Sequence, residues 1–570
     1  MKYFIKKYNK IFIGLITVVI ISNFLELVSI FMLFPIFKSL SHSISLSSII
    51  NLSDFNFMNI DAFNFQVSLK KFLVICFGIY LFKYIFLLFS NYLISRSLFS
   101  ISSSNANDLI NIYLNKNFSD YNKIDRSQII QNTINESANF AFHLLGSLLT
   151  VFSEILFVSL LFIIFMIIKP TETLIIILVI TSLFLVYYFL VIKVFIKKYG
   201  NLRFKNDMAR IKILNDIIEN YQQIKIYNQS ERFLEKFKSF NKIFNLMQAR
   251  HAFFSQVPRH SVEFIGATII IIYFFYIFFN QISINEQIPA IGISIVIAFK
   301  LLPSFNRIIA SLGNIELTKS AYNFLVNEFK NLYLSAYEKN KDDNKKIHFN
   351  NFQKISFNDV SFSYNNKLVY EKLNINFEKN KIYGILGASG SGKSTLINLV
   401  SGFLDPDSGS ITVNDLDISD YRSEWQNNIG LISQSAPLLN STIEENITFG
   451  NFKENKKLLL SKAIKLSKLE DLIEKSENRI NTEVGDLSSF ISGGQAQRIA
   501  IARVIYSERN VILFDEATNA LDKKTEIEIF DSLKNIKTGK IILLITHDTK
   551  LLDICDEIFE LKDKKIIKIR

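Results

Sequence analysis

The sequence predicts an α-helical membrane domain of six transmembrane helices with long cytoplasmic extensions, followed by an α/β phosphate-loop domain. Two observations predict this division. Apolar runs of about 20 residues, long enough to cross a bilayer as helices, are confined to the first half of the 570-residue chain. From Phe352 onward, short apolar strands alternate with helical segments, as in an α/β domain. We expect the domains to cover residues 1–325 and 351–570, with a charged linker at 326–350.

The expected membrane-spanning helices are Ile11–Phe37, Phe72–Ser95, Phe142–Ile168, Thr173–Val194, Ser261–Phe279 and Ile288–Ala310. The first follows several lysines, as a signal peptide would. It is too long for one and no cleavage site follows, so we expect it to remain as an anchor. Lys and Arg are absent between residues 38 and 70 and abundant in 96–139 and 195–259. The positive-inside rule therefore places both termini and the α/β domain in the cytoplasm.

The two long connections between spans carry apolar residues at helical spacing, unlike disordered basic loops. We therefore expect the spanning helices to continue into the cytoplasm. The net charge of +12 would also suit a nucleic-acid partner, but its concentration in these connections favours basic cytoplasmic loops and no nucleic acid. Only Cys76 and Cys555 are present, far apart, so neither a disulfide framework nor a zinc site is indicated.

The strongest motif is a phosphate loop. An apolar strand, Ile382–Leu386, runs into G-A-S-G-S-G-K-S, and a helix follows. Glycines let backbone N–H groups converge on phosphates, and the helix N-terminus adds a positive dipole. Lys393 is expected to bind the β- and γ-phosphates of ATP, and the Ser394 hydroxyl to ligate Mg²⁺. An ordinary Gly-rich turn is the alternative, which the strand–loop–helix setting disfavours. The expected nucleotide-binding residues are Gly387, Ser389, Gly390, Ser391, Gly392, Lys393, Ser394 and Thr395.

A second strand ends in two acids, in the stretch N-V-I-L-F-D-E-A. Asp515 is expected to hold Mg²⁺, and Glu516 to orient and polarise the attacking water. Buried strands rarely end in adjacent carboxylates without a cation to neutralise them. His547 ends a further strand, where it is placed to contact the γ-phosphate. By itself this histidine would be an ordinary loop residue, but its order after the two acids supports the catalytic role.

The stretch F-I-S-G-G-Q-A-Q-R-I-A-I-A-R at 490–503 resembles the signature of ABC transporter ATPases, with Ile491 in place of the usual leucine. The resemblance implies the ABC exporter fold and the cofactors ATP and Mg²⁺. It implies that Tyr364 stacks on adenine and that Gln434 senses Mg²⁺ and takes part in catalysis. It matches T-E-V-G-D at 482–486 and N-A-L-D at 519–522 to two further family loops. Its signature residues are Ser492, Gly493, Gly494 and Gln495.

One chain with six spans and one ATPase resembles a half-transporter. In this family the signature closes on the ATP held by the phosphate loop of a second copy, so the resemblance implies a homodimer with two active sites. The segments near Arg126–Gln131 and Glu219–Tyr227 match the coupling helices of the family.

Ionisable side chains inside membrane spans are rare and mark substrate paths or ion pairs. In one interpretation Lys83 and Lys300 neutralise Glu26 and Glu154 at similar depth. In the other, Arg259, Lys300 and Arg307 form a cationic track for an anionic headgroup, with Lys83 as a further candidate. The ionisable residues in or near the spans are Glu26, Lys83, Glu154, Arg259, Glu263, Lys300 and Arg307.

The spans bear a second resemblance, to bacterial ABC flippases of lipid-linked oligosaccharides, in F-L-E-L-V-S-I-F-M-L-F-P-I, S-E-I-L-F-V-S-L-L, V-P-R-H-S-V-E-F-I-G and A-F-K-L-L-P-S-F-N-R-I-I-A-S. This implies transport of a polyprenyl-pyrophosphate saccharide across the bacterial inner membrane. The alternatives are export of a peptide, lipid or drug, or an ATP-gated channel or sensor. We expect no leader-cleaving exporter, since no protease domain precedes the first span. A multidrug cavity would be more aromatic and less charged, and an intact Glu516 favours a continuous cycle over gating.

Overall fold

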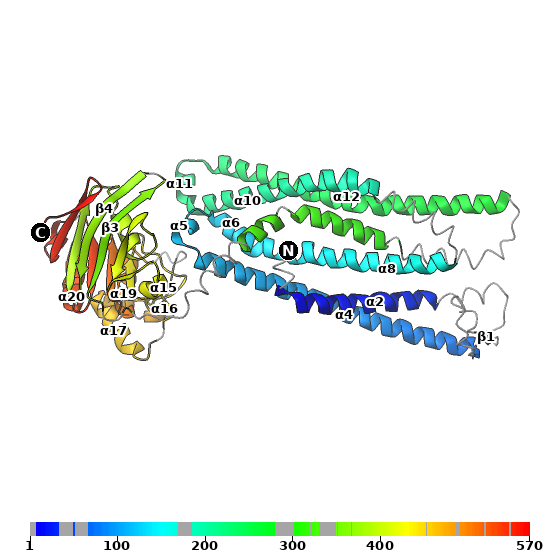
Figure 1. Cartoon of the computed structure of the whole chain (residues 1–570), viewed down its shortest axis with the longest axis horizontal. Coiled ribbons are helices and arrows are strands. Elements are labelled where there is room, and N and C mark those ends of the chain that lie inside the picture. The colour runs from blue at the N-terminus through cyan, green and yellow to red at the C-terminus, as the bar shows by residue number, and fades with distance from the viewer. Residues whose placement is uncertain are drawn as a thin grey trace. The chain divides into compact units, whose positions relative to one another are not determined.

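The computed structural model describes two compact units, which Figure 1 shows as a ribbon. The first contains Met1–Lys116 and Lys123–Glu338, and the second contains Asn117–Asn122 and Lys339–Arg570. The described residues are 7–32, 49–51, 66–168, 185–279, 301, 303–319, 321–329, 349, 352–365, 367–451, 453–485, 491–517, 520–546 and 549–570.

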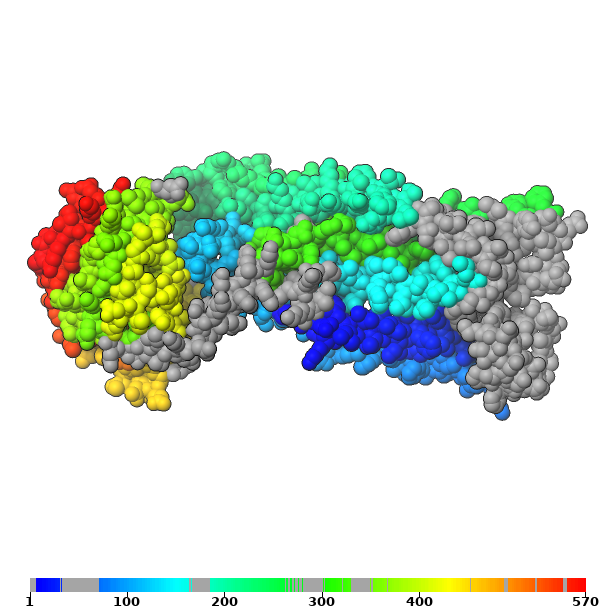
Figure 2. Space-filling model, viewed as in Figure 1, coloured from blue at the N-terminus to red at the C-terminus, as the bar shows by residue number. Residues whose placement is uncertain are grey.

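Long helices build the first unit. The longest, α4 with 47 residues, would extend about 70 Å, more than twice the roughly 30 Å of a bilayer core. The helices therefore continue well beyond a membrane, as the periodicity of the long connections predicted. In Figure 2 the surfaces of α2 and α8, which pack together, lie side by side. The main helices are α2 (Asn9–Phe31), α4 (Leu69–Asn115), α8 (Ser147–Ile168), α10 (Lys197–Glu219) and α12 (Ser230–Phe279).

Within the described part of the chain, three helices are long and apolar enough to cross a membrane: Asn9–Ile30, Lys71–Asn115 and Arg126–Ile163. They contain most of the first three predicted spans. The fifth, Ser261–Phe279, forms the end of α12. The fourth and sixth fall largely on residues 169–184 and 280–300, outside the described residues. A two-stranded pair, β1 (Ile49–Asn51) with β2 (Gln66–Ser68), lies between the first two helices in the chain.

Short helices connect the long ones. The Asp125 side chain caps α6 (Arg126–Ile130) by accepting from the Ser127 N–H at 2.9 Å. Buried polar contacts fix the next segment, because the Gln131 amide donates to Glu136 at 3.2 Å and to Asp207 of α10 at 3.4 Å. The remaining connectors are η2 (Gln131–Glu136), α7 (Ser137–Asn139), η3 (Phe140–Gly146), η4 (Tyr188–Ile196) and α11 (Tyr221–Ile226).

The second unit contains a six-stranded sheet in the order β14-β13-β5-β12-β11-β8. All neighbours in it are parallel except β13 and β14, and its central strands are buried on both faces, which explains their continuous apolar runs. The carboxyl ends of β5, β11, β12 and β8 therefore meet at one edge. The strands are β5 (Lys381–Gly387), β8 (Ile429–Ile432), β11 (Val511–Asp515), β12 (Ile541–Ile545), β13 (Glu557–Lys562) and β14 (Lys565–Lys568).

An antiparallel sheet in the order β4-β3-β6-β7 covers part of this unit, and β9 (Ser441–Thr442) pairs separately with β10 (Glu483–Val484). The antiparallel strands are β3 (Lys354–Tyr364), β4 (Lys367–Glu378), β6 (Ser408–Val413) and β7 (Leu416–Asp417). The helices are α14 (Lys393–Val400), α15 (Arg422–Gln426), α16 (Ile443–Thr448), α17 (Lys456–Leu466), α18 (Glu470–Lys475), η5 (Arg479–Asn481), α19 (Gly493–Ser507), α20 (Lys523–Ile536) and α21 (Thr549–Leu552).

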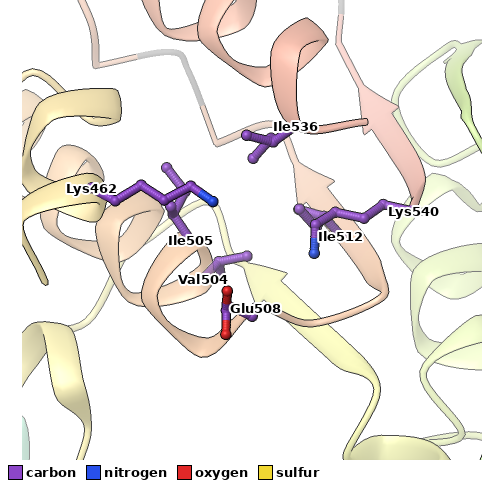
Figure 3. Close-up of a pocket in the computed structure, with 7 residues that line it drawn as sticks. All are labelled: Lys462, Val504, Ile505, Glu508, Ile512, Ile536 and Lys540. Atoms are coloured by element: carbon purple, nitrogen blue, oxygen red, sulfur yellow. The ribbon is translucent and has the colours of Figure 1, made fainter. Parts of the chain in front are cut away.

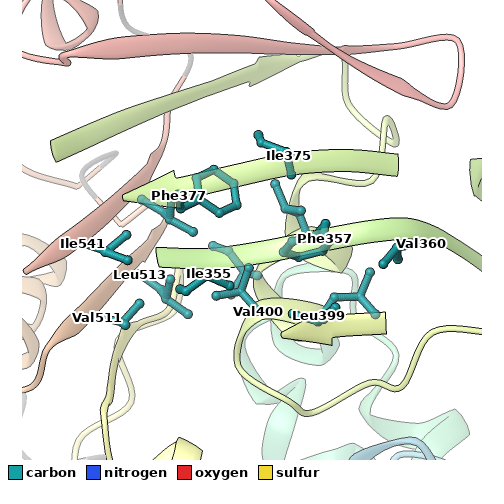
Figure 4. Packing of buried hydrophobic residues seen from close by; sticks show 14 of the residues in the cluster. Ile355, Phe357, Val360, Ile375, Phe377, Leu399, Val400, Val511, Leu513 and Ile541 are labelled. Atoms are coloured by element: carbon teal, nitrogen blue, oxygen red, sulfur yellow. The ribbon is translucent and has the colours of Figure 1, made fainter. Parts of the chain in front are cut away.

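The core of the second unit joins its two sheets. Phe357 and Phe377 of the antiparallel sheet pack in one cluster with Val511 and Leu513 of β11 (Figure 4). Trp425 is fully buried in the same cluster, and its indole N–H donates to the Val400 carbonyl at 2.7 Å. This packing fixes β11 and the end of α14 relative to each other, so the loops at the carboxyl edge have a rigid base.

Candidate functional site

The phosphate loop joins β5 to α14 in the predicted strand–loop–helix arrangement. Gly390 and Gly392 have φ angles of +81° and +106°, which L-residues with side chains rarely adopt. A Cβ on Gly392 would lie 2.8 Å from Val369 Cγ1 and 2.9 Å from the Tyr370 hydroxyl. That hydroxyl donates to the Gly392 carbonyl at 2.7 Å. The glycine at this position is therefore required by backbone conformation and by space.

Lys393 begins α14, and its side chain folds back over the loop. Only 6% of the side chain is exposed, and its ammonium donates to the carbonyls of Gly387 at 2.9 Å and Ala388 at 3.2 Å. It also lies 3.6 Å from a carboxylate oxygen of Glu516. The loop thus encloses the Lys393 ammonium, which contacts two backbone carbonyls of the loop and the Glu516 carboxylate.

The two acids predicted at the end of β11 reach the same place. The Ser394 hydroxyl donates to Asp515 at 3.1 Å, and the Gln434 amide donates to Glu516 at 3.5 Å. Burial raises the pKa of the Asp515 carboxyl, the Ser394 hydrogen bond opposes that rise, and the Glu516 charge adds to it. Ser394, Asp515, Gln434, Glu516 and Lys393 therefore gather from three separate segments at one sheet edge.

These residues fit the predicted cofactors. The Ser391 hydroxyl is buried without a hydrogen-bond partner among the described residues, as expected of a group that faces phosphate oxygens. The hydroxyl of Ser394, the carboxylate of Asp515 and the side-chain oxygen of Gln434 are the hard oxygen ligands that Mg²⁺ prefers. Tyr364, at the end of β3, is 46% exposed, so its ring is accessible for stacking. Ser389 lies exposed in the loop, and Thr395 is buried in the first turn of α14.

The signature residues form the start of α19. The Ser492 hydroxyl accepts from the Gln495 N–H at 3.3 Å, and the Gln495 side chain accepts from the Ser492 N–H at 2.8 Å, which is a capping box. A Cβ on Gly494 would lie 2.6 Å from the Ala520 carbonyl. Ser492 and Gly493 are exposed. The N-terminus of α19, where the helix dipole is positive, is thus capped and exposed.

Three residues singled out in the sequence lie outside the described residues: His547, Lys300 and Asn519 of the N-A-L-D stretch. The roles expected of them remain predictions. The strand that precedes His547, β12, ends at Ile545 beside Asp515 of β11, so the chain leaves the sheet at the same edge as the two acids.

The charged residues of the spans are paired in the described part of the chain. Arg307 binds Glu154 through two hydrogen bonds, of 2.5 and 3.2 Å, with half of the arginine side chain and 11% of the glutamate exposed. The first interpretation of the sequence gave Glu154 a lysine as its partner, and in the described residues it binds Arg307. Arg259 binds Glu263 at 2.9 Å, and the buried Lys83 donates to the Ser29 hydroxyl at 2.8 Å.

One segment that packs in the second unit was not predicted from the sequence. Asn117–Asn122, which contains α5 (Phe118–Tyr121), belongs to this unit. The ring of Phe118 stacks on Phe403 with centroids 5.0 Å apart, and Arg422 donates to the Asn117 side chain at 3.1 Å. A single aromatic between polar residues gives no periodic signal in the sequence, so only the structure reveals this contact.

A separate cavity of about 40 Å³ lies away from the phosphate loop (Figure 3). It is at the amino-terminal ends of β11 and β12, because Ile512 is near the start of β11 and Lys540 precedes β12. The phosphate loop and the two acids lie at the carboxyl ends of β5 and β11, so this cavity is separate from them. Its walls are formed by Lys462, Val504, Ile505, Glu508, Ile512, Ile536 and Lys540.

Comparisons with known proteins agree with this geometry. The model of the ABC transporter transmembrane region matches residues 12–298, and the ABC transporter model matches residues 370–519. A solved structure, that of a bacterial Atm1-family ABC exporter with ATP bound, superposes with a TM-score of 0.76 at 17% identity, covering 98% of this chain and 95% of that one. At this identity the likeness shows the fold.

Three curated relatives match parts of the chain. The ATP-dependent lipid A-core flippase of Vibrio parahaemolyticus is 37% identical over 217 residues, which are 38% of this chain and 37% of that protein. The flippase of the same name from Wigglesworthia glossinidia brevipalpis is 26% identical over 373 residues, covering 65% and 63%. The lactococcin-G-processing and transport ATP-binding protein LagD of Lactococcus lactis is 29% identical over 398 residues, covering 67% and 54%.

The chain therefore spans 37% to 63% of the length of these relatives. The two family models, in contrast, together match most of this chain. Each of them matches the unit that carries the corresponding motifs. The chain belongs to the ABC transporter family, as a half-transporter in which a helical transmembrane domain is followed by an ABC ATPase domain.

Proposed function

We propose that the protein is an ATP-driven exporter of the bacterial inner membrane, with Mg²⁺ as the metal and both termini and the ATPase domain in the cytoplasm. We keep the domain division proposed from the sequence: a transmembrane domain at 1–325, a linker at 326–350 and an ATPase domain at 351–570. The observation that carries the proposal is the gathering of Lys393, Asp515 and Glu516 at the carboxyl edge of one sheet. A phosphate loop, a metal-binding acid and a base are the parts that nucleotide hydrolysis requires.

Each residue has a role that follows from its position. The loop N–H groups and Lys393 bind and orient the phosphates, and for this the lysine must exchange the carbonyls of Gly387 and Ala388 for phosphate oxygens. Ser394, Asp515 and Gln434 would hold Mg²⁺, which neutralises charge that develops on the phosphates. Glu516 orients the attacking water and accepts its proton, with His547 as the proposed contact to the γ-phosphate. Tyr364 stacks on the adenine.

A homodimer supports this chemistry best. The exposed N-terminus of α19, with Ser492, Gly493 and Gly494, is preformed for an anion. A second copy related by a two-fold axis brings the N-terminus of its own α19 to the phosphate loop and closes the nucleotide between the chains. Binding and hydrolysis then alternate closed and open arrangements of the ATPase domains, which drive the transmembrane helices.

The substrate we propose is an anionic lipid, such as a polyprenyl-pyrophosphate saccharide. Arg307 supports it, because half of this guanidinium-bearing side chain is exposed while its partner Glu154 is mostly buried. A planar guanidinium donates two hydrogen bonds to phosphate as readily as to a carboxylate. Arg259, Lys300 and Lys83 are the further candidates along the path. Two relatives named lipid A-core flippases support a lipid substrate.

Peptide export is the second candidate. It is favoured by the relative named for lactococcin-G processing and transport, which matches 67% of this chain. The two candidates differ in the group that would bind Arg307, since a peptide without an anionic group cannot form an ion pair with an exposed guanidinium.

The catalytic assignment is tested with Glu516→Gln in the full chain. The variant should bind a fluorescent ATP analogue with unchanged affinity and lose about 100- to 10,000-fold in turnover, the usual contribution of a positioned base. Turnover within threefold of the unaltered protein would show that the assignment to Glu516 is wrong.

The substrate assignment is tested in proteoliposomes with a fluorescent lipid pyrophosphate saccharide. Arg307→Ala should abolish ATP-dependent flipping and leave basal hydrolysis unchanged. Glu154→Gln is the matched control, because it breaks the same ion pair but keeps the guanidinium available. Loss of flipping in both variants would show that the pair is scaffolding, and transport of a neutral peptide by the unaltered protein would favour the second candidate.

A further inference from the structure

Asn446 is a fully buried polar residue in α16, and every hydrogen-bonding group of its side chain is used. Its amide nitrogen donates to the carbonyls of Leu439 at 3.0 Å and Thr442 at 3.1 Å, with Ser441 at 3.5 Å. Its oxygen accepts from the Leu439 N–H at 2.8 Å. One side chain thus closes the segment 439–442 into a fixed loop, and burial makes each of these bonds costly to lose.

Arg503 of α19 binds the same residue. Its Nε donates to the Asn446 backbone carbonyl at 2.8 Å, and its Nη2 donates to the Asn446 side-chain oxygen at 3.2 Å. A third contact reaches the Pro437 carbonyl at 3.5 Å, and the Phe449 ring covers the guanidinium at 4.5 Å. The planar fork of one arginine therefore joins α16 and the segment before it to the helix that carries the signature.

The segment held in this way adjoins two functional stretches. It is part of the loop that follows β8 and contains Gln434, the residue beside Glu516, and we call residues 433–442 the Gln434 loop. Its last residues form β9, which pairs with β10 at Ser441–Val484 and Thr442–Glu483. The Ile443 N–H also donates to the Thr482 carbonyl at 3.0 Å. The Gln434 loop, the T-E-V-G stretch and α19 therefore meet at Asn446 and Arg503.

We propose that Asn446 and Arg503 are positioning residues that hold the Gln434 loop in register with the signature helix, so that one arrangement sets both Gln434 in its own nucleotide site and Ser492 for the site of the second copy. The inference rests on the proposed hydrolysis of ATP and deepens it. Arg503 is the last residue of the signature stretch and Asn446 lies outside the nucleotide motifs, and the hydrogen bonds given above join them to each other and to the Gln434 loop. Their effect is exerted on the Gln434 loop and the signature helix, because the amide and the guanidinium allow those segments a single relative arrangement.

The structural test is hydrogen–deuterium exchange of the full chain carrying Arg503→Lys. A lysine keeps the charge but has one amine, which cannot bond the Asn446 carbonyl, its side chain and Pro437 together. Loss of one charged hydrogen bond, about 1.4 kcal/mol, corresponds to roughly tenfold faster exchange of the Gln434 loop amides. Exchange of the phosphate loop, 387–394, should not change.

The matched control is Arg498→Lys. Arg498 lies on the same helix, is similarly half-buried, and donates to a single carbonyl, that of Lys468, at 2.7 Å. It should leave exchange of the Gln434 loop within twofold of the unaltered protein. If Arg503→Lys also leaves it within twofold, or if Arg498→Lys raises it equally, the inference is overturned. This outcome is independent of whether the protein hydrolyses ATP.

A functional test separates positioning from general stability. Arg503→Lys should lower kcat about tenfold and leave the KM for ATP within twofold. Partial unfolding would lower the fraction of active protein, and this loss would not depend on whether Gln434 is present. In a double-mutant cycle with Gln434→Ala, the two losses should be non-additive, and those of Arg498→Lys and Gln434→Ala should add. Additive losses for Arg503→Lys would overturn the inference. Full turnover in Gln434→Ala alone would instead refute the proposed role of Gln434, and the exchange experiment would still decide the inference.

Discussion

Two of the three glycines of the phosphate loop, Gly390 and Gly392, provide a comparison whose outcome follows from their surroundings. Alanine at Gly392 must adopt φ +106° and place its Cβ 2.8 Å from Val369 and 2.9 Å from the Tyr370 hydroxyl. Alanine at Gly390 must adopt φ +81°, but nothing lies within 4 Å of its Cβ. The two substitutions thus share a backbone cost, and only the first adds a steric one.

The magnitudes can be worked out separately. Backbone strain of this kind costs about 1–3 kcal/mol, and forcing an extra methyl into packed surroundings adds about 1–3 kcal/mol. In the absence of nucleotide, the altered loop can relax to an unstrained conformation. It must return to the strained conformation to bind phosphate, so the strain energy is lost from the binding affinity. Gly390→Ala should weaken nucleotide binding by about tenfold, and Gly392→Ala by a further factor of roughly ten or more.

The assay is equilibrium binding of a fluorescent ATP analogue to the full-length protein in detergent. Thermal unfolding by circular dichroism is the accompanying control, since both variants should remain folded at the temperature of the binding experiment. Equal affinities for the two variants, or weaker binding by Gly390→Ala, would contradict the reasoning, because the contacts around Gly392 would then not hold the loop.

Three further outcomes are expected from the second unit. Trp425→Phe should lower the thermal unfolding midpoint, because the Val400 carbonyl loses its 2.7 Å donor inside the core at a cost of about 1–3 kcal/mol; an unchanged midpoint would show that the bond is not needed. Burial raises the pKa of Cys555 to about 12, so iodoacetamide at pH 8 should not modify this thiol until urea unfolds the protein, as peptide mass spectrometry can check. Burial also raises the pKa of Asp515, so it takes up a proton at a higher pH than an ordinary aspartic acid. ATP turnover should therefore fall on acidification, and turnover that stays constant as the pH is lowered would argue against an ionised Asp515 as a metal ligand.

The exporter architecture and most of the nucleotide site were predictable from the sequence, because both depend on local patterns. A membrane span needs a continuous apolar run, and a phosphate loop needs glycines and a lysine at fixed spacing between a strand and a helix. The acids of β11 were predictable for a similar reason, since parallel strands deliver their carboxyl ends to one edge. The structure places Lys393, Ser394, Asp515, Glu516 and Gln434 together as that rule requires.

What the sequence could not decide is which side chains meet across long separations. Nothing in the spacing pairs Arg307 with Glu154, 153 residues earlier, rather than with another carboxylate of the spans. The same holds for Phe118 against Phe403 and for Asn446 beneath Arg503. Ion pairs and buried amides are selected by the distance and direction that packing imposes on two helices or loops, so only the tertiary structure specifies them.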